Sequence, residues 1–333
     1  MQNIDYQEMV NSRRLFGGEP TKLMAISPMK HTWARDFWDQ MRANNWNKEE
    51  INFERDKKCF RDDLTDSERR MFEKCLAFLS NLDGIQLHNL TDNISVHVTS
   101  PEVRMVLTRQ AYEEALHVDA YSIMAESFAV NPMEIYTLFM RDEVLKEKND
   151  KILAQSEILK QDGSARSFGL AIISNIILEG VYFYSNFLAF YTLARRGKML
   201  SSADNIRLIQ RDEVCHLNFF IRMHQTMVQE NPHVYDEQFW VDARELFRVS
   251  TELEIAWGKY IIADGVLGLT DSIMEGHIKH LANSRAERIG MSEIFPGVKD
   301  PCSWVEDFSR INGDESNFFE SRVKAYQEGT LAW

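Results

Sequence analysis

Two copies of the spacing Glu-x-x-His are the residues of this chain best suited to chemistry. The first is Glu114 and His117, and Tyr121 follows one turn later on the same face, because residues three and four apart project together from a helix. The second is Glu213 and His216, in another uninterrupted helical stretch. A carboxylate and an imidazole on an apolar face suit a metal ion, since each donates a lone pair and each needs a partner when buried.

A single Glu-x-x-His spacing is weak evidence for a metal site. A chain with 9 His residues is expected to contain roughly one by composition alone, and a hydrogen-bonded core histidine is the commoner explanation. Two copies on two helices are half of the ligand set of a ferritin-like dinuclear carboxylate bundle. The other half of that set is one carboxylate from each of two further helices.

Two acidic residues lie in otherwise apolar helical stretches. Asp83 belongs to the apolar stripe of residues 64–90, where a carboxylate is costly unless it is hydrogen-bonded, protonated or metal-bound. Glu179 is the only charged residue of the most apolar stretch, residues 167–194. That stretch is long enough to span a membrane, but the central helix of a large bundle is also apolar all round, and the lone carboxylate favours the bundle.

These positions together predict a dinuclear metal centre. Four carboxylates and two imidazoles from four helices would hold two ions, and hard oxygen donors with nitrogen suit iron or manganese. No thiolate ligand is implied, so zinc–thiolate and iron–sulfur sites are excluded. The predicted metal ligands are Asp83, Glu114, His117, Glu179, Glu213 and His216.

The composition predicts an all-α protein with one large core. The chain has 333 residues with only 15 Gly and 7 Pro, and its formal net charge of −13 argues against nucleic-acid binding and against attachment to an anionic membrane. Four Cys form no Cys-x-x-Cys pair and no secretory leader precedes them, which favours the cytoplasm. We expect an N-terminal arm over residues 1–27, a ferritin-like helical domain over residues 28–310 and a C-terminal tail over residues 311–333.

The expected elements follow from periodicity and from the breakers. The arm is expected to be irregular or extended, and Trp46 is interpreted from sequence alone as an aromatic packed at a helix end. Residues 161–164 are expected to form a loop. Helices are expected over residues 28–45, 64–90, 101–128, 133–159, 167–194 and 201–229.

From about Lys30 to Tyr326 the chain resembles the small, radical-generating subunit of class I ribonucleotide reductase. The resemblance rests on four ordered motifs: Leu82-Asp83-Gly84-Ile85-Gln86, Glu114-x-x-His117-x-x-x-Tyr121, Leu178-Glu179 and Arg211-Asp212-Glu213-x-x-His216. It implies a ribonucleoside-diphosphate reductase that acts only with a large catalytic subunit and uses a thioredoxin- or glutaredoxin-type reductant. It also implies a homodimer with two iron ions, or with manganese loaded by an activating flavoprotein.

The resemblance further implies a role for each site residue. One metal is bound by Asp83, Glu114 and His117, and the other by Glu179, Glu213 and His216. The metals react with O2, and Tyr121 is then oxidised to a stable radical inside an apolar pocket that includes Phe183, Phe187 and Ile209. Trp46, Asp212 and Tyr326 carry the hole to the large subunit, which the C-terminal tail contacts.

Two other functions stay open at this point. A related dinuclear oxidase acting on a small molecule or lipid is expected to have Glu in place of Asp83, and would have no use for Trp46, Asp212 and Tyr326. A ferritin-like iron-storage protein would need neither Tyr326 nor a docking tail, and would assemble into a shell.

Overall fold

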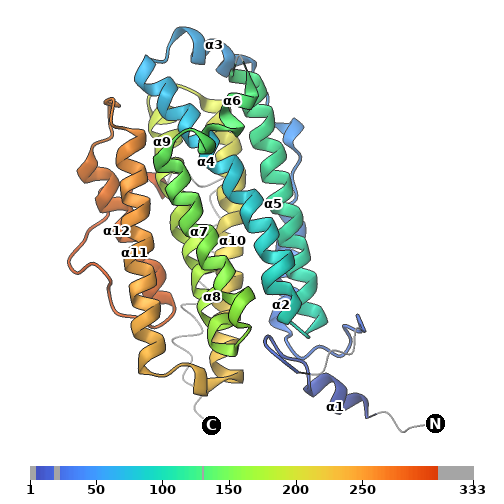
Figure 1. Cartoon of the computed structure of the whole chain (residues 1–333). Coiled ribbons are helices and arrows are strands. Elements are labelled where there is room, and N and C mark those ends of the chain that lie inside the picture. Colours follow the sequence, from blue (N-terminus) through green and yellow to red (C-terminus); the bar gives the residue numbers. More distant parts are fainter. Residues whose placement is uncertain (1–4, 19–22, 130, 307–333) are drawn as a thin grey trace.

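The computed structural model describes residues 5–18, 23–129 and 131–306, which form an elongated bundle of helices (Figure 1). The part of the chain so described contains no β-strand beyond one isolated bridge between Val266 and Leu269. The prediction of an all-α fold is confirmed. The longest helices are α4 (Asp66–His88), α5 (Pro101–Phe128), α10 (Leu200–Glu230) and α11 (Glu237–Ile261).

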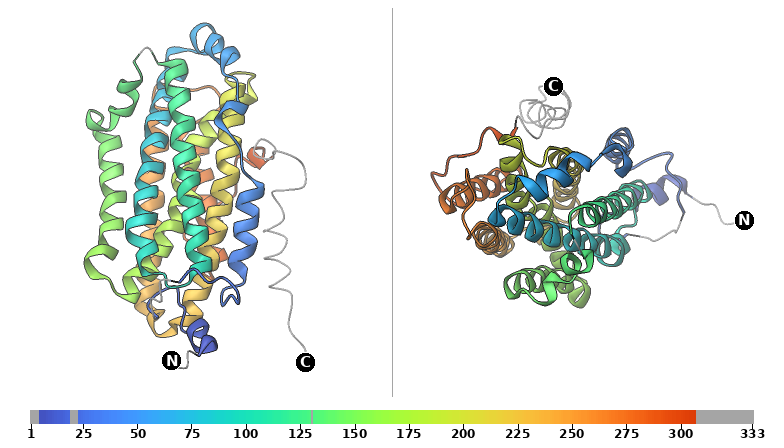
Figure 2. Two further views of the ribbon diagram at one scale, coloured as in Figure 1. Left: turned by 90° about the vertical axis from the view of Figure 1, so that its right-hand side faces the viewer. Right: turned by 90° about the horizontal axis from the view of Figure 1, so that it is seen from above.

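The centre of the bundle is built from α4, α5, α10 and one long interrupted segment. That segment consists of α8 (Ala165–Ile177), a π-helical turn η5 (Leu178–Tyr182) and α9 (Tyr184–Arg195). Helix α4 packs along α5, while α10 packs against α5, α8 and α9. Around them lie α2 (Trp33–Ala43) on the side of α5, and α7 (Glu143–Asp162), α11 and α12 (Asp271–Arg288) on the side of α8 (Figure 2).

Short elements connect these helices. They are α1 (Tyr6–Asn11), η1 (Lys48–Glu50), α3 (Glu54–Asp62), the π-helical η2 (Asn89–Ile94), η3 (Ser95–His97), α6 (Pro132–Tyr136), η4 (Leu138–Met140) and η6 (Pro232–Val234). Helix α1 departs from the irregular arm expected there, because Asp5 caps it by accepting from the backbone N–H groups of Gln7 and Glu8. The expected loop after α7 is present, and Gly163 ends the helix with a left-handed φ of 61°.

Two helices differ from their expected extents for visible physical reasons. Residues 28–32 do not join α2, because the backbone N–H groups of Lys30 and His31 donate to Glu102 at 2.9 and 2.8 Å. The single helix expected over residues 133–159 is divided into α6, η4 and α7. Asp142 restarts the helix by accepting from the backbone N–H of Leu145 at 3.0 Å.

The segment Ala165–Arg195 is a core helix of the bundle and not a membrane span. Its most apolar 18 residues have a mean hydropathy of 1.4, and 89% of them are buried inside the protein. The sequence predicted one continuous helix here, whereas the structure inserts the π-helical turn at Glu179. Gly180 permits side chains of the neighbouring helices to pack closely against this turn, since a Cβ there would lie 2.9 Å from Arg285 Cγ on α12 and 3.1 Å from Leu217 Cδ1 on α10.

A buried ion pair anchors the segment just after that turn. The Lys148 ammonium on α7 donates to Glu254 on α11, and both side chains are buried. Glu254 also accepts from the backbone N–H of Ser185 at 3.2 Å and from the Ser185 hydroxyl, at the start of α9. The ammonium lies 3.6 Å from the ring centroid of Phe78. Burial lowers the Lys148 pKa to about 8, against the opposing effect of Glu254.

We predict that Lys148→Met destabilises the protein by roughly 3–5 kcal/mol, because it leaves the Glu254 carboxylate buried without a counter-charge. Adding Glu254→Gln should recover much of that loss, since the amide still accepts from Ser185 and no charge remains. Denaturant unfolding of the single and double variants measures both effects. Lys151→Met, on the exposed face of the same helix, is the matched control and should change stability little. Equal losses in the single and double variants would contradict this account.

Candidate metal centre

The structure brings the six predicted metal ligands together in the middle of the bundle. They come from four elements: Asp83 from α4, Glu114 and His117 from α5, Glu179 from η5, and Glu213 and His216 from α10. Each of these side chains has no solvent exposure. Four acids and two imidazoles are thus enclosed in an apolar core, where no solvent can balance their charge.

The ligand atoms form two overlapping groups. In each group, every residue offers one nitrogen or oxygen atom that could bind a metal, and these atoms lie within 4.8 Å of one another. One group is Asp83, Glu114, His117 and Glu213, and the other is Glu114, Glu179, Glu213 and His216. Glu213 points Oε1 at His117 Nδ1 and Oε2 at His216 Nδ1, each at 3.0 Å. Glu114 and Glu213 therefore belong to both groups, so each could contact both metal positions.

The unpaired atoms of these residues fit two metal ions. Buried polar atoms without a hydrogen-bond partner include both carboxylate oxygens of Asp83, one oxygen each of Glu114, Glu179 and Glu213, and Nδ1 of His117. Leaving so many polar atoms unpaired in one place is costly, and two divalent cations would satisfy them. Four carboxylates would also neutralise the charge of two such ions.

The pKa shifts of these residues also favour a metal site. Burial raises the pKa of the Asp83 and Glu179 carboxyls well above the usual range, and the neighbouring carboxylates of Glu114 and Glu213 raise it further. Burial lowers the pKa of His117, but the carboxylates around its ring, Glu213 first, outweigh this and raise it. These directions favour the protonated forms of Asp83, Glu179 and His117 in the protein alone, so metal binding at these residues would release protons.

Two glutamine side chains orient Glu179. Its Oε1 accepts from the Gln110 amide at 2.7 Å and also from the amide of Gln86. Asn175 accepts from Gln86 in turn at 2.9 Å. With Oε1 occupied in this way, Oε2 of Glu179 remains free to bind a metal.

On the other side of the centre, Trp46 and Asp212 lie next to His117. The Trp46 indole donates to Asp212 Oδ2 at 2.7 Å, and the same oxygen lies 3.4 Å from His117 Nε2. The Trp46 and His117 rings are nearly parallel at a centroid distance of 6.2 Å. Trp46 was interpreted from sequence alone as packing at a helix end. It is buried there, but its indole N–H also connects the loop after α2 to the centre.

Sequence reasoning missed Glu113. This residue is 1% exposed, and its Oε2 lies 2.9 Å from His216 Nε2. Its Oε1 accepts from Arg109 at 3.0 Å. The signal in the sequence is a pair of adjacent acids at the start of both motifs, Glu113-Glu114 and Asp212-Glu213. From the sequence, Asp212 was interpreted as a functional acid that is not a metal ligand, whereas Glu113 was not.

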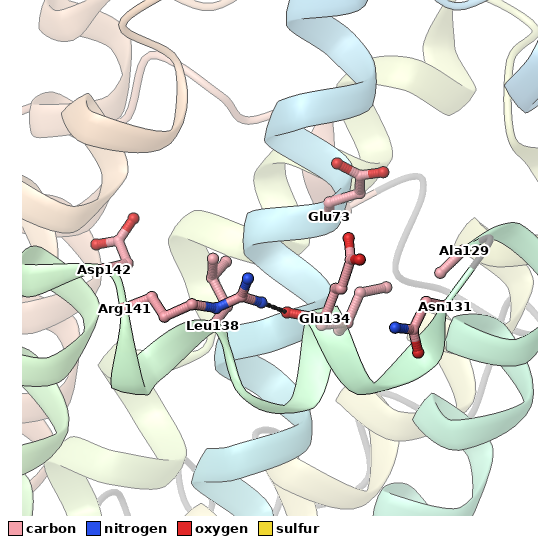
Figure 3. Close-up of a pocket in the computed structure, with 8 residues that line it drawn as sticks. Glu73, Ala129, Asn131, Glu134, Leu138, Arg141 and Asp142 are labelled. Atoms are coloured by element: carbon pink, nitrogen blue, oxygen red, sulfur yellow. Dashed lines mark hydrogen bonds between the residues drawn. The ribbon is translucent and has the colours of Figure 1, made fainter.

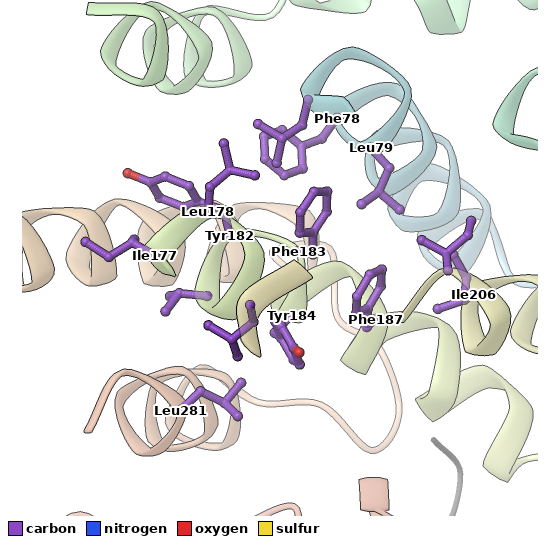
Figure 4. Packing of buried hydrophobic residues seen from close by; sticks show 14 of the residues in the cluster. Phe78, Leu79, Ile177, Leu178, Tyr182, Phe183, Tyr184, Phe187, Ile206 and Leu281 are labelled. Carbon is purple, nitrogen blue, oxygen red and sulfur yellow. The ribbon is translucent and has the colours of Figure 1, made fainter. Parts of the chain in front are cut away.

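Tyr121 is fully buried and its hydroxyl makes no hydrogen bond. Tyr121 lies one turn after His117 on α5. Burial raises its pKa well above the usual range, and the carboxylates of Asp83, Glu213 and Glu114 raise it further. Phe183, Phe187 and Ile209 are buried in the same apolar core. The two phenyl rings stack at a centroid distance of 5.8 Å and an angle of 8° (Figure 4).

Two other features lie away from this centre. Tyr326 and the expected docking tail fall outside the described residues. The pocket of Figure 3 is a depression beside α4, α6 and η4, lined by residues that include Glu73, Glu134, Arg141 and Asp142. None of the six predicted metal ligands lines it, so we assign it no part in the chemistry of the centre.

Known proteins resemble the chain over most of its length. Residues 23–301 match the family model described as ribonucleotide reductase, small chain. The ribonucleoside-diphosphate reductase subunit beta of Treponema pallidum is 35% identical over 327 residues, which cover 96% of this chain and 92% of that protein.

Solved structures resemble it as well. The ribonucleotide reductase R2 subunit of Clostridium botulinum superimposes with a TM-score of 0.86 and 37% identity, covering 90% of this chain and 94% of that one. The dimanganese(II)-NrdF of Streptococcus sanguinis shares the fold, with a TM-score of 0.72 and 20% identity over 81% of this chain and 93% of that one.

We predict different metal stoichiometries for the shared and unshared carboxylates. Asp83→Ala and Glu179→Ala should each lose tight binding of one ion, because each residue belongs to only one ligand group. Glu213→Ala should lose both ions, because Glu213 belongs to both groups. Equilibrium dialysis against Mn²⁺ followed by elemental analysis measures the ions bound per chain. Two tightly bound ions in Glu213→Ala would contradict the bridging arrangement.

Proposed function

The chain belongs to the small-chain family of ribonucleotide reductase, and from this premise we propose that it generates a radical on Tyr121 for a ribonucleoside-diphosphate reductase. The enzyme acts when this subunit pairs with a large catalytic subunit. The observation that carries the proposal is a fully buried phenol next to a fully buried set of four carboxylates and two imidazoles. Such a site holds redox-active metals and keeps water away from the oxidised residue.

The predicted ligands would hold two iron ions, with manganese as the alternative. Asp83 and His117 would hold the first ion, Glu179 and His216 would hold the second, and Glu114 and Glu213 could contribute to both positions. When bound, the ions supply the redox chemistry with O2 that removes an electron from Tyr121. A manganese-loaded centre would depend on an activating flavoprotein.

The surroundings of Tyr121 suit the storage of a radical. Burial favours the neutral phenol and raises its pKa, so the ring would be oxidised from its protonated form. The apolar packing of Phe183, Phe187 and Ile209 excludes water and reductants from the core that contains the ring. Both properties depend on burial, which is complete for Tyr121.

Asp212 accepts a hydrogen bond from Trp46 and also contacts His117. These contacts suit the transfer of the oxidising equivalent, or electron hole, away from the metal centre. This chain of groups begins at a metal ligand and ends on the loop after α2. Tyr326 in the C-terminal tail would then pass the hole to the large subunit, with the tail as the docking segment. The proposal includes a homodimer, and four unpaired, buried cysteines are consistent with the cytoplasm.

The alternatives account for less of the structure. A dinuclear oxidase or an iron-storage bundle would use the same four-helix ligand set. Neither has a use for an indole hydrogen-bonded to the carboxylate that contacts a ligand imidazole. Shell assembly and mineral uptake would be the signs of a storage protein.

We predict that Tyr121→Phe binds two metals and keeps its fold but has neither radical nor turnover, because only the oxidisable hydroxyl is removed. Anaerobic loading with Fe²⁺ and exposure to air, followed by electron paramagnetic resonance, detects the radical. Turnover is assayed with the large subunit. Tyr182→Phe, which alters another buried tyrosine, is the control and should retain both. Full turnover in Tyr121→Phe would refute the proposed function.

We also predict that Tyr326→Phe retains the Tyr121 radical but stops turnover with the large subunit, because storage and transfer use different tyrosines. The same spectrum and assay separate the two steps. Tyr6→Phe, at an exposed tyrosine near the other terminus, should behave as the unmodified protein. Turnover at the normal rate in Tyr326→Phe would remove the tail tyrosine from the route.

A further inference from the structure

The two Glu-x-x-His motifs are joined by a reciprocal pair of contacts outside the metal ligands. Glu113, which precedes Glu114 on α5, contacts His216 of α10 at 2.9 Å. Asp212, which precedes Glu213 on α10, contacts His117 of α5 at 3.4 Å. In each case the acid before one motif meets the imidazole of the other, so the two helices exchange equivalent contacts across the centre.

Both imidazoles have the same orientation as a result. His216 turns Nδ1 toward Glu213, Glu114 and Glu179 at 3.0, 3.3 and 3.7 Å, while Nε2 faces Glu113. His117 likewise turns Nδ1 toward the ligand carboxylates and Nε2 toward Asp212. An imidazole that donates from Nε2 in its neutral form has its lone pair on Nδ1. The outer carboxylates therefore select the tautomer that can bind a metal through Nδ1.

The partners of the two outer carboxylates differ. Asp212 accepts from the Trp46 indole at 2.7 Å. Glu113 instead forms an ion pair with Arg109 at 3.0 Å, and Arg109 also donates to the Met41 carbonyl and to Asn45, each at 3.1 Å. The guanidinium is thus fixed to the end of α2 and the residues that follow it, and both oxygens of Glu113 are occupied.

We propose that Glu113, held by Arg109, is the positioning residue that keeps the Nε2 hydrogen of His216 in place and aims Nδ1 at the second metal position. This inference rests on the proposed dinuclear centre. The second metal position, at Glu179 and His216, would then have its own outer carboxylate in Glu113. The first position, at Asp83 and His117, has Asp212, which is hydrogen-bonded to Trp46. Removing such a carboxylate from a ligating histidine typically weakens metal affinity by about 10- to 100-fold.

The test is Mn²⁺ binding to the full chain, which requires neither O2 nor turnover. Glu113→Met keeps the length of the side chain but removes both oxygens, and Glu113→Gln keeps an acceptor oxygen without the charge. We expect the affinity for one of the two ions to fall about 100-fold in the first variant and about 10-fold in the second. The other ion should bind within about 3-fold of the unmodified protein, because the contact of His117 with Asp212 is untouched.

The spectrum of bound Mn²⁺ shows which position is affected. At one ion per chain, electron paramagnetic resonance of Glu113→Met should match Glu179→Ala, which disrupts the second position, and should differ from Asp83→Ala, which disrupts the first. If Glu113→Met does not fold, the smaller loss in Glu113→Gln carries the same comparison.

Glu102→Gln is the matched control. Glu102 is a buried acid on the same helix that contacts a buried imidazole, His31, at 3.7 Å. It lies 11 positions before Glu113, or about 16 Å along the helix axis. Its substitution should leave Mn²⁺ binding unchanged.

The outcomes separate the inference from the function on which it rests. Unchanged affinity for both ions in both Glu113 variants would overturn the positioning role, and so would an equal loss at both positions. An unmodified protein that binds no Mn²⁺ would overturn the dinuclear centre itself, and this inference with it.

Discussion

The main constraint on the structure is the burial of four carboxylates and two imidazoles in one cluster that contains no lysine or arginine. Asp83, Glu114, Glu179 and Glu213 have no solvent exposure, and several of their oxygens have no partner. Carboxylates buried this way are strongly unfavourable unless protonated or bound to cations. The bundle therefore encloses a site that could hold metal ions, and α4, α5, η5 and α10 each contribute to it.

A second buried charge in the same bundle shows the contrast. Glu254 is as deeply buried as the metal ligands, but Lys148 and Ser185 satisfy it. This pair ties α7 and α11 to the start of α9, immediately after the π-helical turn that carries Glu179. Lys148 supplies a counter-charge for Glu254, so this buried acid stabilises the packing of the helices. The acids that have no such counter-charge form the candidate metal site.

The centre is nearly symmetric among the metal ligands and asymmetric around them. Helices α5 and α10 each provide a carboxylate that belongs to both candidate ligand groups and an imidazole, and each imidazole contacts an acid from the opposite helix. One of these acids continues to the indole of Trp46 and the other to the guanidinium of Arg109. An indole can be oxidised and a guanidinium cannot at the same potential, so the surroundings of His117 and His216 differ in their chemistry.

The helical class and the six candidate ligands could be predicted from the sequence, because the spacing of three residues and the lone acids in apolar stretches are local properties of a helix. That Glu114 and Glu213 belong to both ligand groups could not be predicted in this way, since it depends on how α5 and α10 approach each other. The tertiary structure also decided the role of Glu113. Adjacent residues on a helix point about 100° apart, and which of those directions is buried is set by the neighbouring helix rather than by the chain itself. The close packing of Arg285 and Leu217 against Gly180 also depends on tertiary structure, because it is a contact between distant parts of the sequence.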